Sequence, residues 1–295
     1  MKPVLVAEVG GNHLGSLMRA KLLVVAASGA GADAVKFQCF TPEQMCAPDQ
    51  VLQDGPWKGR NLLSLYRETH TPRDWFPELF AHAKDLGLVP FASVFHPDDV
   101  DFLETLGCMM YKVASFELTD HHLIAHAART GKPIIISIGM ATYNEILGAG
   151  RAAFDDGCLE LTFLKCTSAY PADASDANLA TLADLQDLRY TGPHTGRSIQ
   201  IGLSDHTPGI GVAVAAVALG ATMIEKHLTL RRPDGGPDAA FSMEPEEFGQ
   251  MVTECRRAAA AIGTVQYGPT QAEKSSLTLR RPPGGMRGAP RGTIA

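Results

Sequence analysis

Eight short apolar runs alternate along this chain with longer segments whose apolar residues recur at helical spacing. The runs are residues 3–10, 33–38, 89–95, 110–115, 133–139, 161–166, 201–206 and 222–230. They are rich in Val, Ile, Leu and Phe and nearly continuous, which is typical of parallel strands buried on both faces. One intervening segment shows the helical period in Leu17, Ala20, Val24 and Ala27. Eight strand–helix units predict an α/β fold, a closed TIM (β/α)8 barrel. An open doubly wound sheet alternates in the same way and is the alternative.

Two segments depart from this rhythm. Residues 268–295 are dense in Arg, Gly and Pro with few apolar anchors, and such a segment cannot bury enough surface to form a core. We therefore expect a TIM-barrel domain over residues 1–267 and a short disordered tail over 268–295. Residues 39–71 form the longest interruption, between the second run and its helix. A loop of that length in a compact domain is usually functional or disordered, and we interpret it as a lid over the substrate.

Charge and cysteine content limit the partners of this protein. The net charge is −6, so no general basic field favours nucleic acid or an anionic membrane. The six cysteines lie far apart without a C-x-x-C pair, which indicates reduced thiols rather than disulfides or a zinc knuckle. The first residues hold too few apolar side chains for a signal peptide or membrane span. We expect a cytoplasmic protein that binds anions locally.

Polar residues end most of the apolar runs, where the working groups of a TIM barrel lie. Side chains alternate along a strand, so Ser204 shares a face with His206, and Glu225 shares one with His227. These pairs are therefore expected to converge on one cavity. Asp205 has the opposite parity, and we expect it to orient a neighbouring loop.

His206 and His227 close consecutive predicted strands. Neighbouring strands lie about 4.8 Å apart, so both imidazoles can reach one divalent ion. Two histidines leave coordination positions open for water and substrate, unlike a structural zinc site. The alternative is that each histidine only hydrogen-bonds a loop.

Lys36 and Lys112 are candidates for an anion site. Neutral donors that could assist them at phosphate oxygens are Ser93, Ser115, Ser137, Ser168 and Ser204. A lysine buried at a barrel mouth requires a bound anion or a carboxylate partner, so ion pairs with Glu8 or Glu117 are the alternative. Lys112 and Glu117 have opposite parity, which requires the strand to end or bulge between them.

Three carboxylates are candidates for polar chemistry. Glu8 is a candidate general acid or base. Glu117 and Asp238 are candidate acceptors for the hydroxyl or amide groups of a polar substrate. Carboxylates of this kind are individually unspecific.

Several segments together resemble one known family. They are AEVGGNHLGS, AGADAVKFQ, YKVASFELTD, GKPIIISIGMAT, LKCTSAYPA, IGLSDHTPGIGVAVAAVALGA, IEKHLTL and GGPDAAFSMEPEEF. In this order they resemble the sialic acid synthase family of phosphoenolpyruvate-dependent nine-carbon sugar-acid synthases, over residues 4–263. Four segments, WKGR, KVASFELTD, LKCTSAYPA and GGPDAAFSMEPEEF, are most similar to the pseudaminic acid synthases, rather than to the N-acetylneuraminate or legionaminic acid synthases.

The resemblance implies a transferase that depends on Mn²⁺ or Mg²⁺. C3 of phosphoenolpyruvate attacks the open-chain aldehyde of a 2-acetamido hexose, water adds at C2 and phosphate leaves. It implies that His206 and His227 bind the metal and that Glu8 manages a proton beside the reacting carbons. The implied phosphoenolpyruvate-binding residues are Lys36, Ser93, Lys112, Ser115, Ser137, Ser168 and Ser204. The implied sugar-binding residues are Gln38, Glu117, Tyr170 and Asp238.

Three departures from the family pattern bear on function. The usual S-T-P-F is replaced by Ala92–Phe95, in which Ser93 retains a hydroxyl, and the usual S-T-G-M has Ile138, which cannot donate. The family also continues into an antifreeze-protein-like domain that crosses a homodimer and places an arginine over the partner's sugar. This chain stops where that domain would begin, and none of its tail arginines matches that residue.

Two further hypotheses compete with an active synthase. The barrel could have lost turnover and serve as a ligand-binding subunit that borrows the absent domain from another chain. It could also be an unrelated metal hydrolase, because fold alone does not fix chemistry. A third histidine or a bridging carboxylate at the metal would favour the hydrolase.

Overall fold

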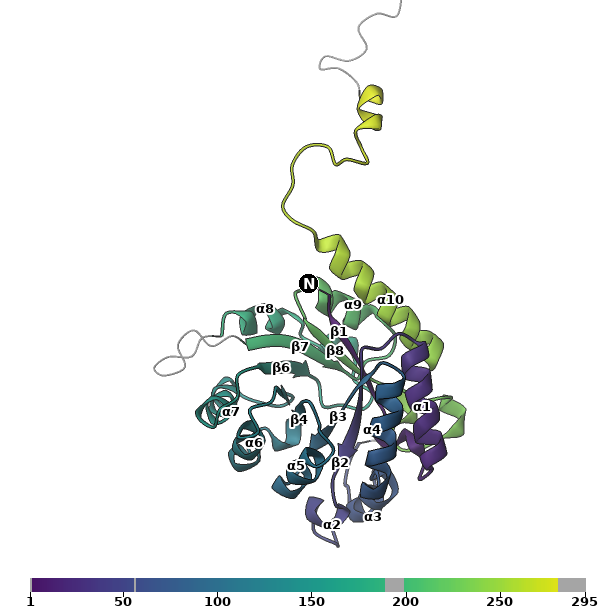
Figure 1. Cartoon of the computed structure of the whole chain (residues 1–295), viewed down its shortest axis with the longest axis vertical. Coiled ribbons are helices and arrows are strands. Elements are labelled where there is room, and N and C mark those ends of the chain that lie inside the picture. Colours follow the sequence, from purple (N-terminus) through teal and green to yellow (C-terminus); the bar gives the residue numbers. More distant parts are fainter. Residues whose placement is uncertain (1, 56, 189–198, 281–295) are drawn as a thin grey trace, which may run out of the picture. The chain divides into compact units, whose positions relative to one another are not determined.

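The computed structural model describes residues 2–55, 57–188 and 199–280. Within these ranges eight parallel strands form one closed barrel in chain order (Figure 1). They are β1 (Val4–Glu8), β2 (Ala34–Cys39), β3 (Val89–Val94), β4 (Tyr111–Val113), β5 (Ile134–Ser137), β6 (Leu161–Cys166), β7 (Ile199–Asp205) and β8 (Met223–His227). β1 pairs with both β2 and β8. The predicted TIM barrel is confirmed, and the closed ladder excludes the open sheet.

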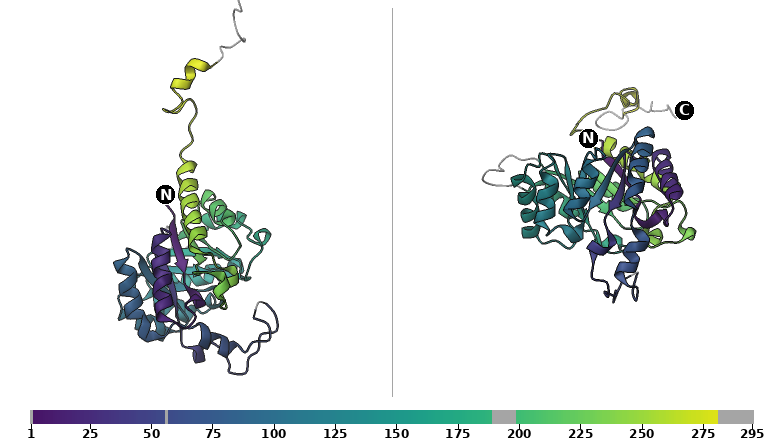
Figure 2. Two further views of the ribbon diagram at one scale, coloured as in Figure 1. Left: turned by 90° about the vertical axis from the view of Figure 1, so that its right-hand side faces the viewer. Right: turned by 60° about the horizontal axis from the view of Figure 1, so that its bottom comes forward.

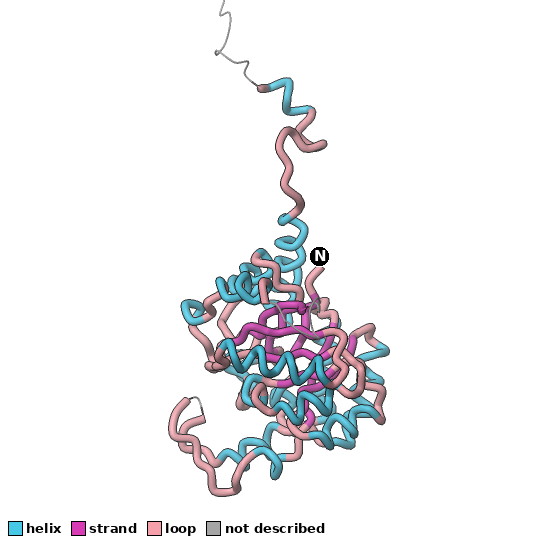
Figure 3. The backbone as a smooth tube through the Cα atoms, turned by 90° about the vertical axis from the view of Figure 1, so that its left-hand side faces the viewer, coloured by secondary structure: helices cyan, strands magenta, loops and turns pink. Residues whose placement is uncertain are grey.

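Helices surround the strands, as Figure 3 shows with the strands at the centre. The α-helices in the described ranges are α1 (Leu17–Gly29), α2 (Pro42–Met45), α3 (Leu62–Thr69), α4 (Phe76–Asp85), α5 (Pro97–Glu104), α6 (His121–Ala128), α7 (Tyr143–Asp155), α8 (Ala180–Gln186), α9 (Gly211–Ala218) and α10 (Pro245–Ile262). Local caps determine where several of them begin. Asp120 accepts a hydrogen bond from the Leu123 amide at the start of α6, and Thr142 with Glu145 forms a capping box for α7.

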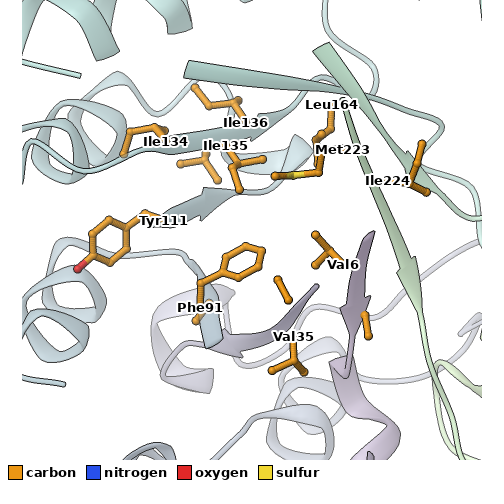
Figure 4. Close-up of a cluster of buried hydrophobic side chains, with 14 of the residues drawn as sticks. Val6, Val35, Phe91, Tyr111, Ile134, Ile135, Ile136, Leu164, Met223 and Ile224 are labelled. Atoms are coloured by element: carbon orange, nitrogen blue, oxygen red, sulfur yellow. The ribbon is translucent and has the colours of Figure 1, made fainter. Parts of the chain in front are cut away.

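The interior of the barrel changes from apolar to polar along the strands. Buried side chains of Val6, Phe91 and Met223 extend toward one another between the strands (Figure 4). Two residues further along, the same inward face carries Glu8, Ser93, Ser137 and Glu225, all buried. The polar side chains of the site thus rest on a dry apolar layer.

The predicted interruption at 39–71 contains more structure than a single loop. It holds α2 and α3, joined by a segment in which Val51 and Asn61 form an isolated antiparallel bridge. Figures 1 and 2 show α2 and α3 at the end of the barrel opposite the amino terminus. They therefore lie at the carboxyl ends of the strands.

Several strands are shorter than their apolar runs. The runs at 3–10, 133–139 and 222–230 overshoot their strands by two or three residues at the carboxyl end. The first residues past the strands, Val9, Ile138 and Leu228, are buried, and each still donates its backbone amide to the neighbouring strand. Burial and interstrand hydrogen bonding thus continue one residue past the strand bounds, and the apolar runs follow them.

The chain divides into a compact unit that ends at Ile262 and a second unit from Gly263. In the second unit, residues 263–280 are described and contain one 3-10 helix, Ser275–Leu279. Residues 281–295 of the expected tail lie outside the described ranges, and the expected domain boundary after residue 267 stays a prediction.

All six cysteines lie in the described ranges, and no disulfide bond joins them. Among the described helices, none combines the length and the apolar content needed to span a bilayer.

Gly202 is expected to be essential to barrel closure. A Cβ there would lie 2.6 Å from Leu164 Cδ2 and closer still to the Met223 carbonyl oxygen. Gly202→Ala should therefore lower the free energy of unfolding by about 1–3 kcal/mol through overpacking. Denaturant titration measures the loss. Gly29→Ala is the control, since a Cβ there meets nothing within 4 Å; an equal effect of both changes would contradict the packing argument.

Candidate active site

Charged side chains meet in the polar half of the barrel interior. Lys36 Nζ lies 2.7 Å from Glu8 Oε2 and 3.7 Å from Glu225 Oε2, and it donates to Ser93 Oγ at 2.9 Å. Gln38 donates to Glu8 Oε1 at 2.8 Å. The carboxylate partner that the sequence left open for Lys36 is thus present.

Lys112 has no comparable partner. Its side chain is 2% exposed, and its Nζ donates only to the Val113 carbonyl oxygen, at 3.2 Å. No carboxylate in the described ranges forms an ion pair with it. Burial therefore lowers the pKa of Lys112. A buried ammonium without a counterion favours binding of an anion.

The two interior carboxyl groups differ in proton affinity. Burial raises the pKa of Glu8, and the nearby Glu225 carboxylate adds to this rise. Burial also acts on Glu225, but the charges of Lys36 and Lys112 lower its pKa overall. Glu8 is therefore the group of the pair that more readily holds a proton, the kind of divergence found in acid–base sites.

Three serines of the predicted anion site lie near the end of β5. Ser115 and Ser168 lie beside Gly139, and Ser137 is the last residue of β5. Ser115 Oγ accepts a hydrogen bond from the Gly139 amide at 3.0 Å. A Cβ at Gly139 would collide with the hydroxyls of both Ser115 and Ser168, so only glycine admits them. Ser137 Oγ is buried without a hydrogen-bond partner in the described ranges. These hydroxyls are available to a ligand.

The two candidate metal ligands lie side by side. The rings of His206 and His227 have centroids 5.5 Å apart. His206 Nδ1 lies 3.0 Å from the Thr167 carbonyl oxygen, a contact that requires a proton on Nδ1 and leaves Nε2 free to bind a metal. The Cys166 thiol lies 3.8 Å from the same nitrogen.

The pKa values of the two imidazoles are shifted in opposite directions. Burial and the positive charges of His206 and Lys36 hold the pKa of His227 well below its usual range. A neutral imidazole is the form that binds metals. Burial acts in the same direction on His206, but its contacts with Cys166 and Thr167 raise the pKa of that ring.

The residues present fit a divalent cation with open coordination positions. His227 Nδ1 is buried without a hydrogen-bond partner in the described part of the chain; as an unprotonated nitrogen it could bind a metal, and as N–H it could donate to a substrate. No cluster of three or more His, Cys, Asp or Glu suited to a metal occurs among the described residues. The third ligand that would have favoured a metal hydrolase is thus not found there.

Asp238 lies beside His227 because Gly10 leaves room for it and the Gly11 amide holds it. The Gly11 amide donates to Asp238 Oδ2 at 2.8 Å, and this oxygen lies 3.8 Å from His227 Nδ1. Gly10 has a φ of +50°, and a Cβ on it would collide with Asp238. The Gly-Gly pair after β1 is thus required both for the turn and for the placement of this carboxylate.

A cavity of about 520 Å³ opens beside the imidazoles. Its polar lining includes Gln38, Glu117, Tyr170, His227 and Asp238, which are predicted site residues. Much of its apolar lining comes from the 39–71 segment, namely Phe40, Met45, Leu52, Trp57, Leu62 and Leu65. A cavity of this size and mixed lining suits a small-molecule ligand.

Trp57 connects the 39–71 segment to loops after β6 and β8. Its indole nitrogen donates to the Pro237 carbonyl oxygen at 3.1 Å, and its ring centroid lies 5.6 Å from that of Tyr170. Tyr170 in turn lies 4.5 Å from the His206 ring. These contacts place the predicted lid over the cavity mouth, whereas its movement stays a prediction.

The parity conflict between Lys112 and Glu117 is resolved by the backbone. β4 ends at Val113, and a 3-10 helix at Ser115–Glu117 redirects the chain, as the parity argument required. Glu117 Oε2 is buried without a hydrogen-bond partner among the described residues. Burial raises the pKa of Glu117 to about 7.

The structure brings the predicted site residues to one end of the barrel, where they divide into two groups. The cavity-lining group is Gln38, Glu117, Tyr170, His227 and Asp238, and the interior group is Glu8, Lys36, Ser93, Lys112, Ser137, Ser204 and His206. Ser115 and Ser168 flank Gly139 between β4 and β6. Their roles stay predictions.

The sequence placed Glu225 on the inward face with His227 but assigned it no role, and it did not point to Cys166. Ser204 Oγ donates to Glu225 Oε1 at 3.1 Å, which places this carboxylate beside Lys36. Its pairing with Lys36 depends on strand register, which the sequence alone did not provide. Cys166 shares that face with Ser204, its register partner on β7, but an isolated cysteine in a strand gave no such indication.

Comparison with known proteins gives consistent matches. The model of the NeuB family matches residues 23–267. The pseudaminic acid synthase of Helicobacter pylori is 40% identical over 265 residues, which cover 88% of this chain and 76% of that protein. The N,N'-diacetyllegionaminic acid synthase of Campylobacter jejuni is 33% identical over 288 residues, 95% of this chain and 83% of that protein.

A solved structure matches over a similar extent. The crystal structure of N-acetylneuraminic acid (sialic acid) synthetase from Leptospira borgpetersenii, in complex with citrate, superposes with a TM-score of 0.82 at 29% identity. The match covers 95% of this chain and 92% of that one. The resemblance to the sialic acid synthases is thus confirmed.

The buried carboxyl of Glu117 is expected to make stability fall as pH rises. Between its ordinary value of 4.5 and about 7, the unfolded chain releases this proton while the folded chain keeps it. Relative to Glu117→Gln, the wild type should therefore lose up to about 3 kcal/mol of unfolding free energy across this window. Denaturant titrations at about pH 5 and pH 8 measure the difference. Glu160→Gln, at an exposed carboxylate, is the control; parallel pH profiles for wild type and Glu117→Gln would contradict the prediction.

Proposed function

The chain belongs to the NeuB family, and from that premise we propose that it is an enzyme that condenses phosphoenolpyruvate with the aldehyde of an acetamido hexose. The products are phosphate and a nine-carbon 2-keto-3-deoxy sugar acid. Similarity to the synthase of Helicobacter pylori supports a product like pseudaminic acid. The alternatives within the family are N-acetylneuraminate and legionaminic acid.

One observation carries the proposal most strongly. Two buried lysines, of which Lys112 has no carboxylate partner in the described ranges, share the polar end of the barrel interior with two adjacent imidazoles. Fixed positive charge of this kind is preorganised to hold a phosphate and a carboxylate. Phosphoenolpyruvate presents both groups.

The carbon–carbon bond forms when the enol electron pair at C3 attacks the aldehyde carbon, and the aldehyde oxygen then takes up a proton. Water adds its oxygen at C2 and the C2–oxygen bond to phosphate breaks; of the two water protons, one balances the proton taken up by the aldehyde oxygen and the other leaves with phosphate. Glu8 Oε1 accepts from Gln38 and Oε2 pairs with Lys36, and we assign to this carboxyl group the exchange of a proton with the aldehyde oxygen. Lys36, Lys112 and the serines hold the phosphoenolpyruvate.

His206 and His227 would hold Mn²⁺ or Mg²⁺. When bound there, the ion would act as a Lewis acid on the aldehyde oxygen, an effect worth several kcal/mol. The neutral His227 ring and the Nε2 atom of His206 are the donors available for it. Asp238 Oδ2 lies 3.8 Å from His227 Nδ1, beyond hydrogen-bond distance, and adds negative charge beside that ring.

The acceptor sugar would occupy the cavity beside the imidazoles. Gln38, Glu117, Tyr170 and Asp238 would receive its hydroxyl and amide groups. The aromatic wall that contains Trp57 would contact its apolar faces and exclude water. We place the reaction in the cytoplasm, with the homodimer of the family as the working assembly, and we assign the protein no nucleic-acid or membrane partner.

A catalytically impaired barrel that binds ligand is the second candidate. The observation that favours it is Ile138, which replaces a hydroxyl residue at the end of β5 and cannot donate to a substrate. Such a protein would bind phosphoenolpyruvate without turnover.

A direct assay tests the proposed reaction. The protein is incubated with Mn²⁺, phosphoenolpyruvate and a panel of acetamido hexoses, and phosphate release is measured. We expect release only with the correct hexose, and loss of release on addition of EDTA because the Lewis acid is removed. Phosphoenolpyruvate binding by calorimetry without release from any hexose would instead support the ligand-binding subunit.

Lys112→Met separates binding of the anion from folding. Removal of the ammonium should lower kcat/KM by about 100-fold or more, because a preorganised countercharge is lost. The free energy of unfolding should stay equal or rise, by up to about 2 kcal/mol, since a desolvated charge is removed. The control is Lys21→Met. Lys21 lies on α1, is partly exposed and pairs with Glu78. Full activity of Lys112→Met would rule out this role.

A further inference from the structure

Two successive cross-strand pairs link the carboxyl ends of β7 and β8, directly before the two histidines. Ser204 is the register partner of Glu225, and Asp205 is the partner of Lys226. His206 and His227 follow directly, with their rings 5.5 Å apart. Side chains alternate between faces, so the Asp205–Lys226 pair lies on the outward side, between two inward pairs of the site.

The Asp205–Lys226 pair is fully buried and holds the chain on both sides of His206. Lys226 Nζ lies 2.5 Å from Asp205 Oδ2 and donates to the Thr207 carbonyl oxygen at 2.5 Å. Asp205 Oδ1 accepts from the Thr207 amide and hydroxyl at 2.9 and 2.8 Å. The Lys226 and Asp205 side chains are 0% and 1% exposed.

Stability alone does not explain an ion pair at this position. Desolvation of a buried pair consumes most of its Coulombic gain, and an apolar pair of similar volume often stabilises a protein as well or better. Directional bonds provide what apolar packing does not, a defined relative position of the two strand ends. Here they define the positions of residues 205 and 207 relative to residue 226, next to His227.

The His227 ring depends on this backbone placement. His206 is oriented by its bond to Thr167, whereas His227 Nδ1 has no hydrogen-bond partner in the described ranges. Apart from packing against Phe241, with centroids 5.0 Å apart, the ring is positioned by its own main chain. A shift of β8 against β7 would therefore change the distance between the two imidazoles.

We propose that Asp205, Lys226 and Thr207 form a clasp that positions His206 and His227 for a divalent cation. These three are positioning residues, because none of them faces the cation. The inference rests on the proposed function in one respect, since it assumes that the two imidazoles bind the metal. It adds the residues that set their separation.

The test compares Mn²⁺ affinity with stability in a charge-neutral double variant. Asp205→Asn/Lys226→Met removes both charges at nearly constant volume and leaves no uncompensated buried ion. Mn²⁺ alone is titrated by calorimetry, and free Mn²⁺ is followed by its electron paramagnetic resonance signal. We expect Mn²⁺ affinity to fall about 10- to 100-fold, as for partners that orient metal ligands, with little change in the denaturation midpoint.

A control uses an ion pair away from the site in which only the carboxylate is buried. Asp99 and Arg73 lie 2.7 Å apart, with the Asp99 side chain fully buried and the Arg73 side chain 38% exposed. Asp99→Asn/Arg73→Met should leave Mn²⁺ affinity within twofold of wild type, whatever its effect on stability. Lys226→Arg, which keeps the charge, should retain more affinity than the double variant.

The outcomes separate this inference from the proposed function. If the wild type binds no Mn²⁺, or if His206→Ala binds it normally, the metal site fails and the clasp with it. If the wild type binds Mn²⁺ and the folded double variant binds it equally well, only the clasp is overturned. Should the double variant not fold, Thr207→Val removes one clasp bond and keeps the ion pair. A fall of about threefold in Mn²⁺ affinity for that variant, at unchanged stability, would support the clasp, and no fall would overturn it.

Discussion

The change from apolar to polar side chains inside the barrel is the constraint on which the rest of this structure depends. Val6, Phe91 and Met223 fill the interior on the amino-terminal side of the charged groups. This apolar layer separates the charges from solvent on that side. The groups two residues further along must therefore be neutralised by one another or by a ligand. Lys36 meets this requirement through Glu8 and Glu225, and Lys112 does not.

The unequal pairing of the two lysines determines which ligands the site favours. Lys36 and Lys112 supply two positive charges, whereas only Glu225 of the two neighbouring carboxyl groups has a lowered pKa. The interior therefore favours the binding of an anion. Glu8 is the carboxyl group there that is suited to exchange protons. A small polyanion with both phosphate and carboxylate matches this requirement better than a neutral ligand does.

The cavity above the interior is built from parts of the chain that are far apart in sequence. Trp57 donates to Pro237 across 180 positions, and Asp238 depends on the backbone of Gly11. The 39–71 segment supplies much of the apolar wall, whereas strand ends and later loops supply the polar groups. In the proposed function, recognition of the acceptor would thus depend on loops, while the charged groups of the interior stand on strands. Rigid strands favour precise geometry at those atoms.

The amino-acid sequence by itself determined the number of strands, their parallel character and the residues that face inward at their ends. Burial on both faces leaves a continuous apolar run, and strict alternation assigns each following side chain to a face. His206, His227, Lys36 and Lys112 could be predicted for this reason. Neither rule depends on knowing which distant segments touch.

Only the tertiary structure decided which charges are paired, because pairing depends on register and on contacts between distant segments. The sequence allowed Lys112 to pair with Glu117, and β4 does end between them, but no ion pair joins the two in the described ranges. It placed Glu225 on the inward face with His227, but only the register of β7 and β8 shows that this carboxylate lies beside Ser204 and Lys36. The exact strand ends were likewise decided by the tertiary structure, since the apolar runs continue two or three residues past β1, β5 and β8.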